Sequence, residues 1–248
     1  MENKPNVLNP SGRRKEENKP NVLVAGFPKC GSTYLYHLLK QHPDIFIPKI
    51  KEINYFNRDH FFIGDPDILN PRQFKSIDWY YNFFNSDKKI KIDFSILSAL
   101  DITTARKARK VLGDIKIIFI TRNKKDFLNS VKNFMEKEGS FYKDYEEYSD
   151  FDYYIENYRK HFSNLLIVSL EKLNKNPKKE LNNITKFLGI KKHNFNLEMP
   201  GHKTEDYKMS FGQYIKRRGY FFVVRNFYKL ISLTVKANLK ARGENDKT

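Results

Sequence analysis

Short apolar runs alternate with longer segments of helical periodicity along most of the chain. The apolar runs predict buried β-strands over residues 21–25, 88–93, 115–122 and 164–173, the last including a turn. Segments with one apolar face predict helices over residues 31–41, 97–113, 123–139, 148–162 and 176–190. A further helix is expected over residues 70–84, where Asn70 and Pro71 form a helix-start signal. Strands that alternate with helices predict an α/β fold with a parallel, doubly wound sheet.

The two ends of the chain depart from this pattern. Residues 1–20 are rich in Asn, Pro and charge, which predicts a flexible tail before a domain over residues 21–240. Residues 211–240 are aromatic and basic with helical spacing, and we expect helices packed on the core. The alternative is a basic amphipathic segment that rests on an anionic membrane or polymer. Residues 241–248 are expected to form a polar tail.

Composition narrows the classes of partner. With 248 residues, 40% of them hydrophobic, the chain is long and apolar enough for one large globular domain. The formal net charge of +17 favours anionic partners, but the charges are spread along the chain, so no nucleic-acid groove is indicated. The only cysteine is Cys30, and the sequence has neither a signal-peptide core nor an apolar run of membrane length. We therefore expect a soluble, cytoplasmic protein, with a secreted protein lacking disulfides as the alternative.

Residues 26–33, with the sequence GFPKCGST, join the first predicted strand to the first predicted helix. Backbone N–H groups between two glycines at a helix start form a cradle for an anion, and the helix dipole adds positive charge. Lys29 lies inside this cradle, and Ser32 and Thr33 add hydroxyl groups. In the nucleoside triphosphate loop GxxxxGK[ST] the lysine would follow the second glycine, where this chain has Ser32. The loop thus predicts a phosphate site of another kind, the alternative being an ordinary turn with an exposed lysine.

The segment FPKCGSTYLYHLL, residues 27–39, strongly resembles the 5′-phosphosulfate-binding loop of sulfotransferases that use 3′-phosphoadenosine-5′-phosphosulfate (PAPS). The resemblance implies a P-loop-like three-layer sandwich with a central parallel sheet flanked by helices. It also implies PAPS as co-substrate and the bisphosphate PAP as product. The implied donor-binding residues of the loop are Pro28, Lys29, Cys30, Gly31, Ser32 and Thr33. Among them, the resemblance implies that Lys29 holds the 5′-phosphate side and covers the bridging oxygen that leaves.

The same family binds the 3′-phosphate with an arginine at a strand end and a serine in the following helix. The segment IIFITRNKKDFLNS supplies Arg122 and Ser130, eight positions apart, as in the family. An arginine offers a planar fork to a phosphate dianion, which makes a charge-assisted bond. Lys124 and Phe127 stand where the family commonly has proline and arginine. The late segment PGHKTEDYK resembles the loop that closes over the nucleotide and implies a phosphate contact for Lys203.

Sulfuryl transfer also requires a group that removes the proton of the acceptor hydroxyl or amine. The segment KEINYF, residues 51–56, resembles the Lys-Glu-x-x-(Tyr/Phe)-Phe segment of glycan-acting, heparan-sulfate-type members, which implies Glu52 as the base. A solvated Lys-Glu pair is the alternative, and His42 is a rival base that more often has a structural role. Asp93 ends the second predicted strand, at a place where related enzymes carry Asp or Lys; the resemblance implies that it faces the acceptor, and the alternative is that it caps the next helix.

These residues favour a PAPS-dependent sulfotransferase whose acceptor is a glycan or glycoconjugate. The six histidines and single cysteine show no metal-ligand spacing, so no metal is expected. Two alternatives stay open: a P-loop kinase of a small metabolite, which would need magnesium, and a non-catalytic protein that binds nucleotides or polyanions.

Overall fold

The computed structural model describes residues 15–57, 71–138 and 145–198. Within them, five strands form one sheet in the order β2-β3-β1-β4-β5, and every pair of neighbouring strands is parallel. The strands are β1 (Val22–Gly26), β2 (Ile45–Phe46), β3 (Ile90–Asp93), β4 (Lys116–Thr121) and β5 (Leu165–Ser169). The α-helices are α1 (Ser32–Leu39), α2 (Ile77–Tyr81), α3 (Thr104–Leu112), α4 (Lys124–Glu138), α5 (Phe151–Arg159), α6 (Leu170–Lys175) and α7 (Pro177–Leu188).

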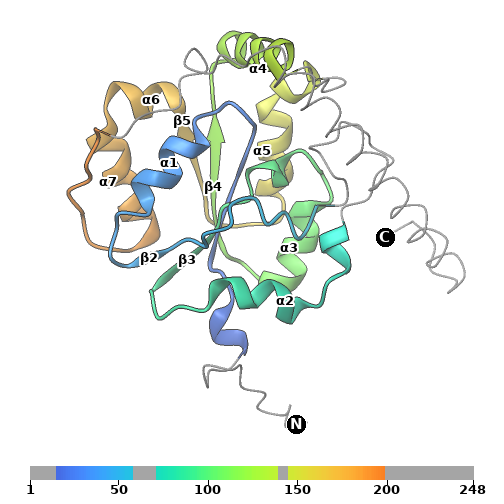
Figure 1. Cartoon of the computed structure of the whole chain (residues 1–248), viewed down its shortest axis with the longest axis vertical. Coiled ribbons are helices and arrows are strands. Elements are labelled where there is room, and N and C mark those ends of the chain that lie inside the picture. The colour runs from blue at the N-terminus through green and yellow to red at the C-terminus, as the bar shows by residue number, and fades with distance from the viewer. Residues whose placement is uncertain (1–14, 58–70, 139–144, 199–248) are drawn as a thin grey trace, which may run out of the picture.

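The helices cover both faces of this sheet. Figure 1 shows α1, α6 and α7 on one side of the strands and α3 and α5 on the other, with α4 across the end of β4. All five residues of β1 are buried, because this strand lies between β3 and β4 and has helices over both of its faces. The predicted three-layer α/β architecture is therefore confirmed.

Register explains why one edge of the sheet gathers the candidate residues. Gly26 at the end of β1 pairs with Ile120 of β4, and Thr121 pairs with Ser169 at the end of β5. Asp93 ends β3, the other neighbour of β1. Since the strands are parallel, the segments that follow them all leave from the same edge.

Two predicted helices are interrupted by local side-chain hydrogen bonds. Over residues 71–84 the chain forms a 3-10 turn (Pro71–Phe74), then α2, then a second 3-10 turn (Asn82–Phe84). The break falls at Ser76, whose hydroxyl caps α2 by accepting from the N–H of Trp79 at 3.2 Å. The expected cap, Asn70, lies outside the described residues.

The helix expected over residues 97–113 is likewise divided. A 3-10 turn (Ile96–Ala99) precedes α3, and the carboxylate of Asp101 between them accepts hydrogen bonds from the N–H and the hydroxyl of Thr103. This local alternative to helical bonding separates the two elements. The helix does end at Gly113, as the sequence predicts.

The predicted N-terminal tail, residues 1–20, is only partly within the described chain. Its last residues form a 3-10 turn (Lys15–Asn18), and Asn18 is buried, so the packed domain begins before residue 21. The predicted helices at 211–240 and the tail at 241–248 lie outside the described residues. Where the helices are described, none has the length and apolar character to cross a membrane.

Candidate active site

The loop of residues 26–31 starts at the end of β1, at the centre of the sheet, and has a glycine at each end. At both positions the structure favours glycine over any other residue. A Cβ atom on Gly26 would lie 2.6 Å from the carbonyl oxygen of Ile120 on β4. Gly31 is the N-cap of α1 and has a left-handed backbone with φ 81°. The glycine loop, as we call residues 26–31, therefore has a conformation that other residues would strain.

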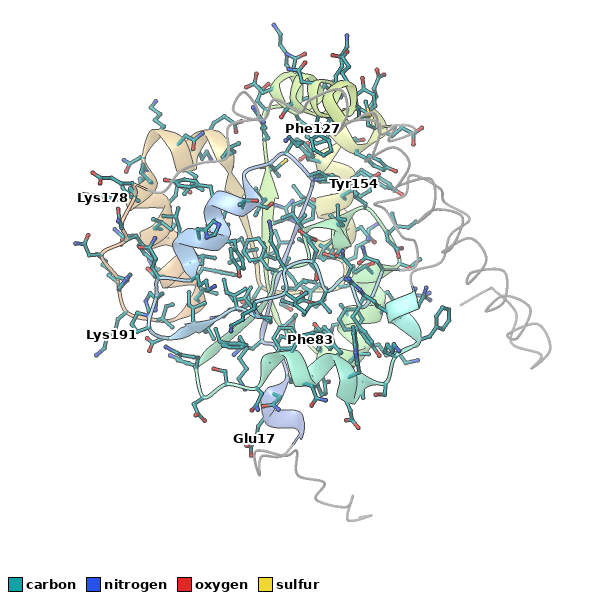
Figure 2. All side chains as sticks on the ribbon, in the orientation of Figure 1. Glu17, Phe83, Phe127, Tyr154, Lys178 and Lys191 are labelled. Atoms are coloured by element: carbon teal, nitrogen blue, oxygen red, sulfur yellow. The ribbon has the colours of Figure 1, made fainter. Side chains whose placement is uncertain are left out.

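Aromatic packing anchors the glycine loop to the core. Phe27 is fully buried, and its ring contacts those of Phe127 and Tyr154 at centroid distances of 6.1 and 5.2 Å. Phe127 and Tyr154 are labelled in Figure 2, where they lie on the α4 and α5 side of the sheet. These contacts fix the core-facing side of the glycine loop, so a ligand would contact its opposite side.

Lys29 is held in a strained conformation at the centre of this loop. Its backbone has φ 66°, in the left-handed region that non-glycine residues rarely adopt. Its Nζ lies 4.7 Å from the ring centroid of Phe134 on α4. A cation–π contact of this kind is worth about 0.5–1 kcal/mol at an exposed site, less than a charge-assisted bond to phosphate, so an anion can compete for the ammonium group.

A second lysine, Lys51, reaches the start of α1. Its Nζ donates to Ser32 Oγ at 3.1 Å and to Thr33 Oγ1 at 3.3 Å. Burial lowers its pKa, against the opposing effect of the neighbouring Glu52 carboxylate. The helix N-terminus thus has a partly buried cation beside its two hydroxyl groups. Lys51 was not predicted as a site residue, although its position directly before Glu52 is a signal in the sequence.

Arg122 joins the second candidate motif to the first. It follows β4, and its Nη1 donates to the carbonyl oxygen of Lys29 at 2.9 Å. Ser130 lies on α4, partly exposed, with the buried Phe127 and Val131 anchoring the same helix. The structure therefore brings the glycine loop and the strand end of Arg122 into direct contact.

Glu52 lies on an irregular segment that an arginine holds in place. Its backbone has φ 60°, and Arg72 Nη1 donates to the carbonyl oxygens of Glu52 and Ile53 at 2.6 and 2.9 Å. The Glu52 Oε2 accepts from the N–H of Leu97 at 3.4 Å. Burial raises the pKa of Glu52 to about 7, although Lys51 opposes the shift. A carboxyl group with such a pKa can accept a proton near neutral pH.

Asp93 is almost completely buried, with 1% of its surface exposed. Its Oδ2 accepts from the Tyr80 hydroxyl at 2.7 Å and its Oδ1 from the Ser95 hydroxyl at 2.5 Å. The Ser95 hydroxyl also accepts from the N–H of Asn54, two residues after Glu52. Burial raises the pKa of Asp93 to about 6, against both hydrogen bonds. These contacts connect Asp93 to the Glu52 segment through Ser95.

Three candidates from the sequence remain, of which two lie within the described residues. Cys30 is fully buried, which raises the pKa of its thiol, so its side chain is a core group. His42 is buried, with Nε2 at 2.9 Å from the Lys191 carbonyl and Nδ1 accepting from the N–H of Asp44, which fits the structural role. Lys203 lies outside the described residues.

A small hollow borders the glycine loop on the α4 side. It is lined by Pro28, Lys29, Leu100, Phe127, Val131, Phe134, Tyr145 and Tyr148.

Over the described parts of the chain, no group of three or more His, Cys, Asp or Glu side chains is arranged to hold a metal ion.

The chain is similar to known sulfotransferases in sequence and in structure. Residues 19–200 match the family described as the sulfotransferase domain. Over 80 residues, 30% of this chain, it is 35% identical to the human bifunctional heparan sulfate N-deacetylase/N-sulfotransferase 3. The match spans only 8% of the length of that relative.

Two solved structures share the fold. A sulfotransferase from Alicyclobacillus acidocaldarius superimposes with a TM-score of 0.58 and 20% identity, over 84% of this chain and 94% of the other. The sulfotransferase domain of the Synechococcus PCC 7002 olefin synthase gives a TM-score of 0.50 and 19% identity, over 88% and 91% of the two chains. The P-loop-like fold predicted from the sequence is confirmed by this likeness.

Proposed function

Because this chain belongs to the sulfotransferase family, we propose that it transfers a sulfuryl group from PAPS to a hydroxyl or amine of a glycan or glycoconjugate. One observation carries the donor assignment: Arg122 donates a hydrogen bond to the carbonyl oxygen of Lys29 at 2.9 Å. This contact supports the proposal that one nucleotide binds both motifs, with its 5′-phosphosulfate on the glycine loop and its 3′-phosphate on Arg122 and Ser130. The backbone of residues 28–31, the start of α1 and Lys203 would complete the donor site.

In the proposed reaction, the acceptor oxygen or nitrogen forms a bond to sulfur as the bond from sulfur to the bridging oxygen breaks. The electron pair of the broken bond stays on the 5′-phosphate of PAP. Lys29 neutralises the charge that develops on this oxygen, and Lys51, which contacts Ser32 and Thr33, adds a second cation at the same helix end. No metal ion is needed to supply this charge.

Glu52 is the proposed base. It removes the proton of the acceptor as the new bond to sulfur forms, and its pKa of about 7 suits that step. The left-handed backbone at Glu52, held by Arg72, supports a functional constraint on this position. In this proposal Asp93 helps to orient the acceptor. It contacts Ser95, which in turn accepts from the N–H of Asn54, so Asp93 also helps to fix the Glu52 segment.

A glycan acceptor is supported by the heparan sulfate enzyme among the relatives and by the net charge of +17. A strongly basic protein attracts polyanions, so an acidic or already sulfated glycan fits better than a neutral one.

Titration calorimetry with PAP and with ATP, each with and without magnesium, tests the donor assignment. We expect PAP to bind independently of magnesium and more tightly than ATP. Arg122→Ala should weaken PAP binding about tenfold or more, because a hydrogen bond to a charged group is worth about 1.5–3 kcal/mol. Arg106→Ala, on the exposed face of α3, is the matched control. Tighter, magnesium-dependent binding of ATP would instead favour the kinase alternative.

A further inference from the structure

The turn from β5 into α6 contacts the strand end that bears Arg122. Glu171, in the first turn of α6, accepts a hydrogen bond at Oε1 from the N–H of Asn123, the residue after Arg122, at 2.8 Å. Its Oε2 accepts from the Ser169 hydroxyl at 2.7 Å. Because Ser169 pairs with Thr121, one carboxylate links the ends of two adjacent strands.

The same turn also packs against the glycine loop. A Cβ atom on Gly31 would lie 2.4 Å from Cδ1 of Leu170, the residue between Ser169 and Glu171. Arg122 in turn donates to the carbonyl oxygen of Lys29. The glycine loop, the strand end that bears Arg122 and the β5–α6 turn therefore contact one another in a closed ring.

The negative charge of Glu171 does not by itself explain why a carboxylate lies beside Arg122 at a proposed phosphate site. The pKa of Glu171 lies below its usual value. Partial burial raises this pKa, but the hydrogen bonds from Asn123 and Ser169 and the charge of Arg122 together lower it by more. The group is therefore ionised at neutral pH. A negative charge beside Arg122 weakens the attraction of the guanidinium for phosphate, so its contribution to a phosphate site has to be geometric.

We infer that Glu171 is a positioning residue for the 3′-phosphate of the donor, which it serves by fixing the peptide that follows Arg122. A guanidinium forms its strongest bonds to phosphate only in a restricted orientation, and the Asn123 contact restrains the backbone from which Arg122 extends. Glu171 can have this role only if the donor assignment proposed above is correct. Glu171 was not predicted as a site residue, because its partner Asn123 lies 48 positions away in sequence.

Binding of two nucleotides that differ in one phosphate tests this inference. PAP has the 3′-phosphate, and adenosine 5′-monophosphate (AMP) lacks it. For Glu171→Ala we expect PAP affinity to fall about tenfold, and AMP affinity to change by less than about twofold, since only the 3′-phosphate contact is disturbed. Glu171→Gln keeps an acceptor for Asn123 and removes the negative charge, so its PAP affinity should equal or exceed that of the parent. Glu180→Ala, in the first turn of α7, should leave both affinities unchanged.

The outcomes separate this inference from the donor assignment. If the parent does not bind PAP more tightly than AMP, the donor assignment fails and the role of Glu171 fails with it. If the parent distinguishes the two nucleotides but Glu171→Ala keeps the same ratio, only the role of Glu171 is overturned. Equal losses of PAP and AMP binding would also overturn it, because they indicate general damage to the fold.

Discussion

At the scale of single residues, Lys29 and Glu52 share a feature that the bulk of the chain lacks. They are two of the three non-glycine residues with positive φ in the described part of the chain. Each has its carbonyl oxygen held by an arginine, Arg122 for Lys29 and Arg72 for Glu52. Such conformations are unfavourable by about 1–3 kcal/mol and persist where surrounding contacts impose them. This shared strain supports functional roles for both residues.

Glu52 makes the pH dependence of transfer a direct test of the proposed base. Its pKa is raised to about 7, and only the deprotonated form accepts a proton. The rate should therefore rise with pH and level off above about 7, and fall about tenfold per unit below it. Glu52→Gln should lower the rate by about 10²–10⁴ and abolish this dependence. The measurement is a pH profile of kcat/KM for the acceptor under saturating donor.

Lys51→Met offers a second readout of the same carboxylate. The Lys51 ammonium lowers the pKa of Glu52, so its removal should shift the midpoint of the profile to higher pH. An unchanged midpoint in Lys51→Met, together with a normal profile in Glu52→Gln, would show that another group titrates.

Asp93 is expected to matter for stability as well as activity. Asp93→Ala leaves the buried hydroxyl groups of Tyr80 and Ser95 without their acceptor, each a loss of about 1–3 kcal/mol. Urea unfolding should show a lower free energy of unfolding, while Asp152→Ala on the exposed surface of α5 should change it by less than about 0.5 kcal/mol. Equal stability of the two variants would contradict the observed network.

Several site residues could be predicted from sequence because strand ends and glycine turns fix their place. Lys29 and Arg122 each follow a buried strand, and parallel strands bring such residues to one edge. Lys51 and Arg72 do not follow a strand end, and Glu171, although it follows β5, was not predicted from the sequence. Their contacts depend on how separate segments pack together, Lys51 against the start of α1, Arg72 against the Glu52 segment and Glu171 against the peptide after Arg122, with partners 18 to 48 positions away in sequence.

At the scale of elements, β1, β3, β4 and β5 were predicted from the sequence, whereas β2 and α6 were not, and two further helices were predicted only in part. Continuous apolar runs specify a buried parallel strand, which is why β1 and β4 lie close to their predicted positions. The sequence of β3, IKID, alternates apolar and polar residues, yet all four of its residues are buried. The breaks at Ser76 and Asp101 arise from side-chain hydrogen bonds to nearby backbone, which compete with helix formation and leave the apolar pattern unchanged.

The joint between the glycine loop and α6 gives a prediction at this scale. Gly31 and Gly189 both have left-handed backbones, with φ 81° and 74°, so Ala at either position should lose about 1–2 kcal/mol of stability. Gly31→Ala also drives a Cβ into Leu170, whereas at Gly189 the nearest atom is the flexible Lys116 Nζ at 3.7 Å. Urea unfolding should therefore show the larger loss for Gly31→Ala.

The double variant Gly31→Ala with Leu170→Ala checks the cause of that extra loss. Removing the Leu170 side chain should recover part of the difference between the two glycine variants. If the two glycine variants lose the same stability, or if the double variant is simply the sum of its parts, the loop and α6 are not in the contact described.

At the scale of the whole molecule, the net charge of +17 predicts a strong dependence on ionic strength. Exposed charges are screened within about 10 Å at 0.1 M salt, so the KM for an anionic glycan should rise as salt increases. The KM for an uncharged acceptor should change little. Steady-state kinetics with a matched pair of sulfated and desulfated glycans at several salt concentrations measure this effect. An anionic acceptor whose KM is insensitive to salt would remove the charge argument.

The most direct test of the central claim is transfer of a radiolabelled sulfuryl group from PAPS to a panel of neutral and anionic glycans. The account predicts labelled product from the parent, and a rate about 10²–10³ lower for Lys29→Ala, because that ammonium stabilises the departing oxygen. Lys125→Ala, exposed at the start of α4, should behave as the parent. Equal transfer by Lys29→Ala, or PAPS binding with no transfer to any glycan of the panel, would contradict the account.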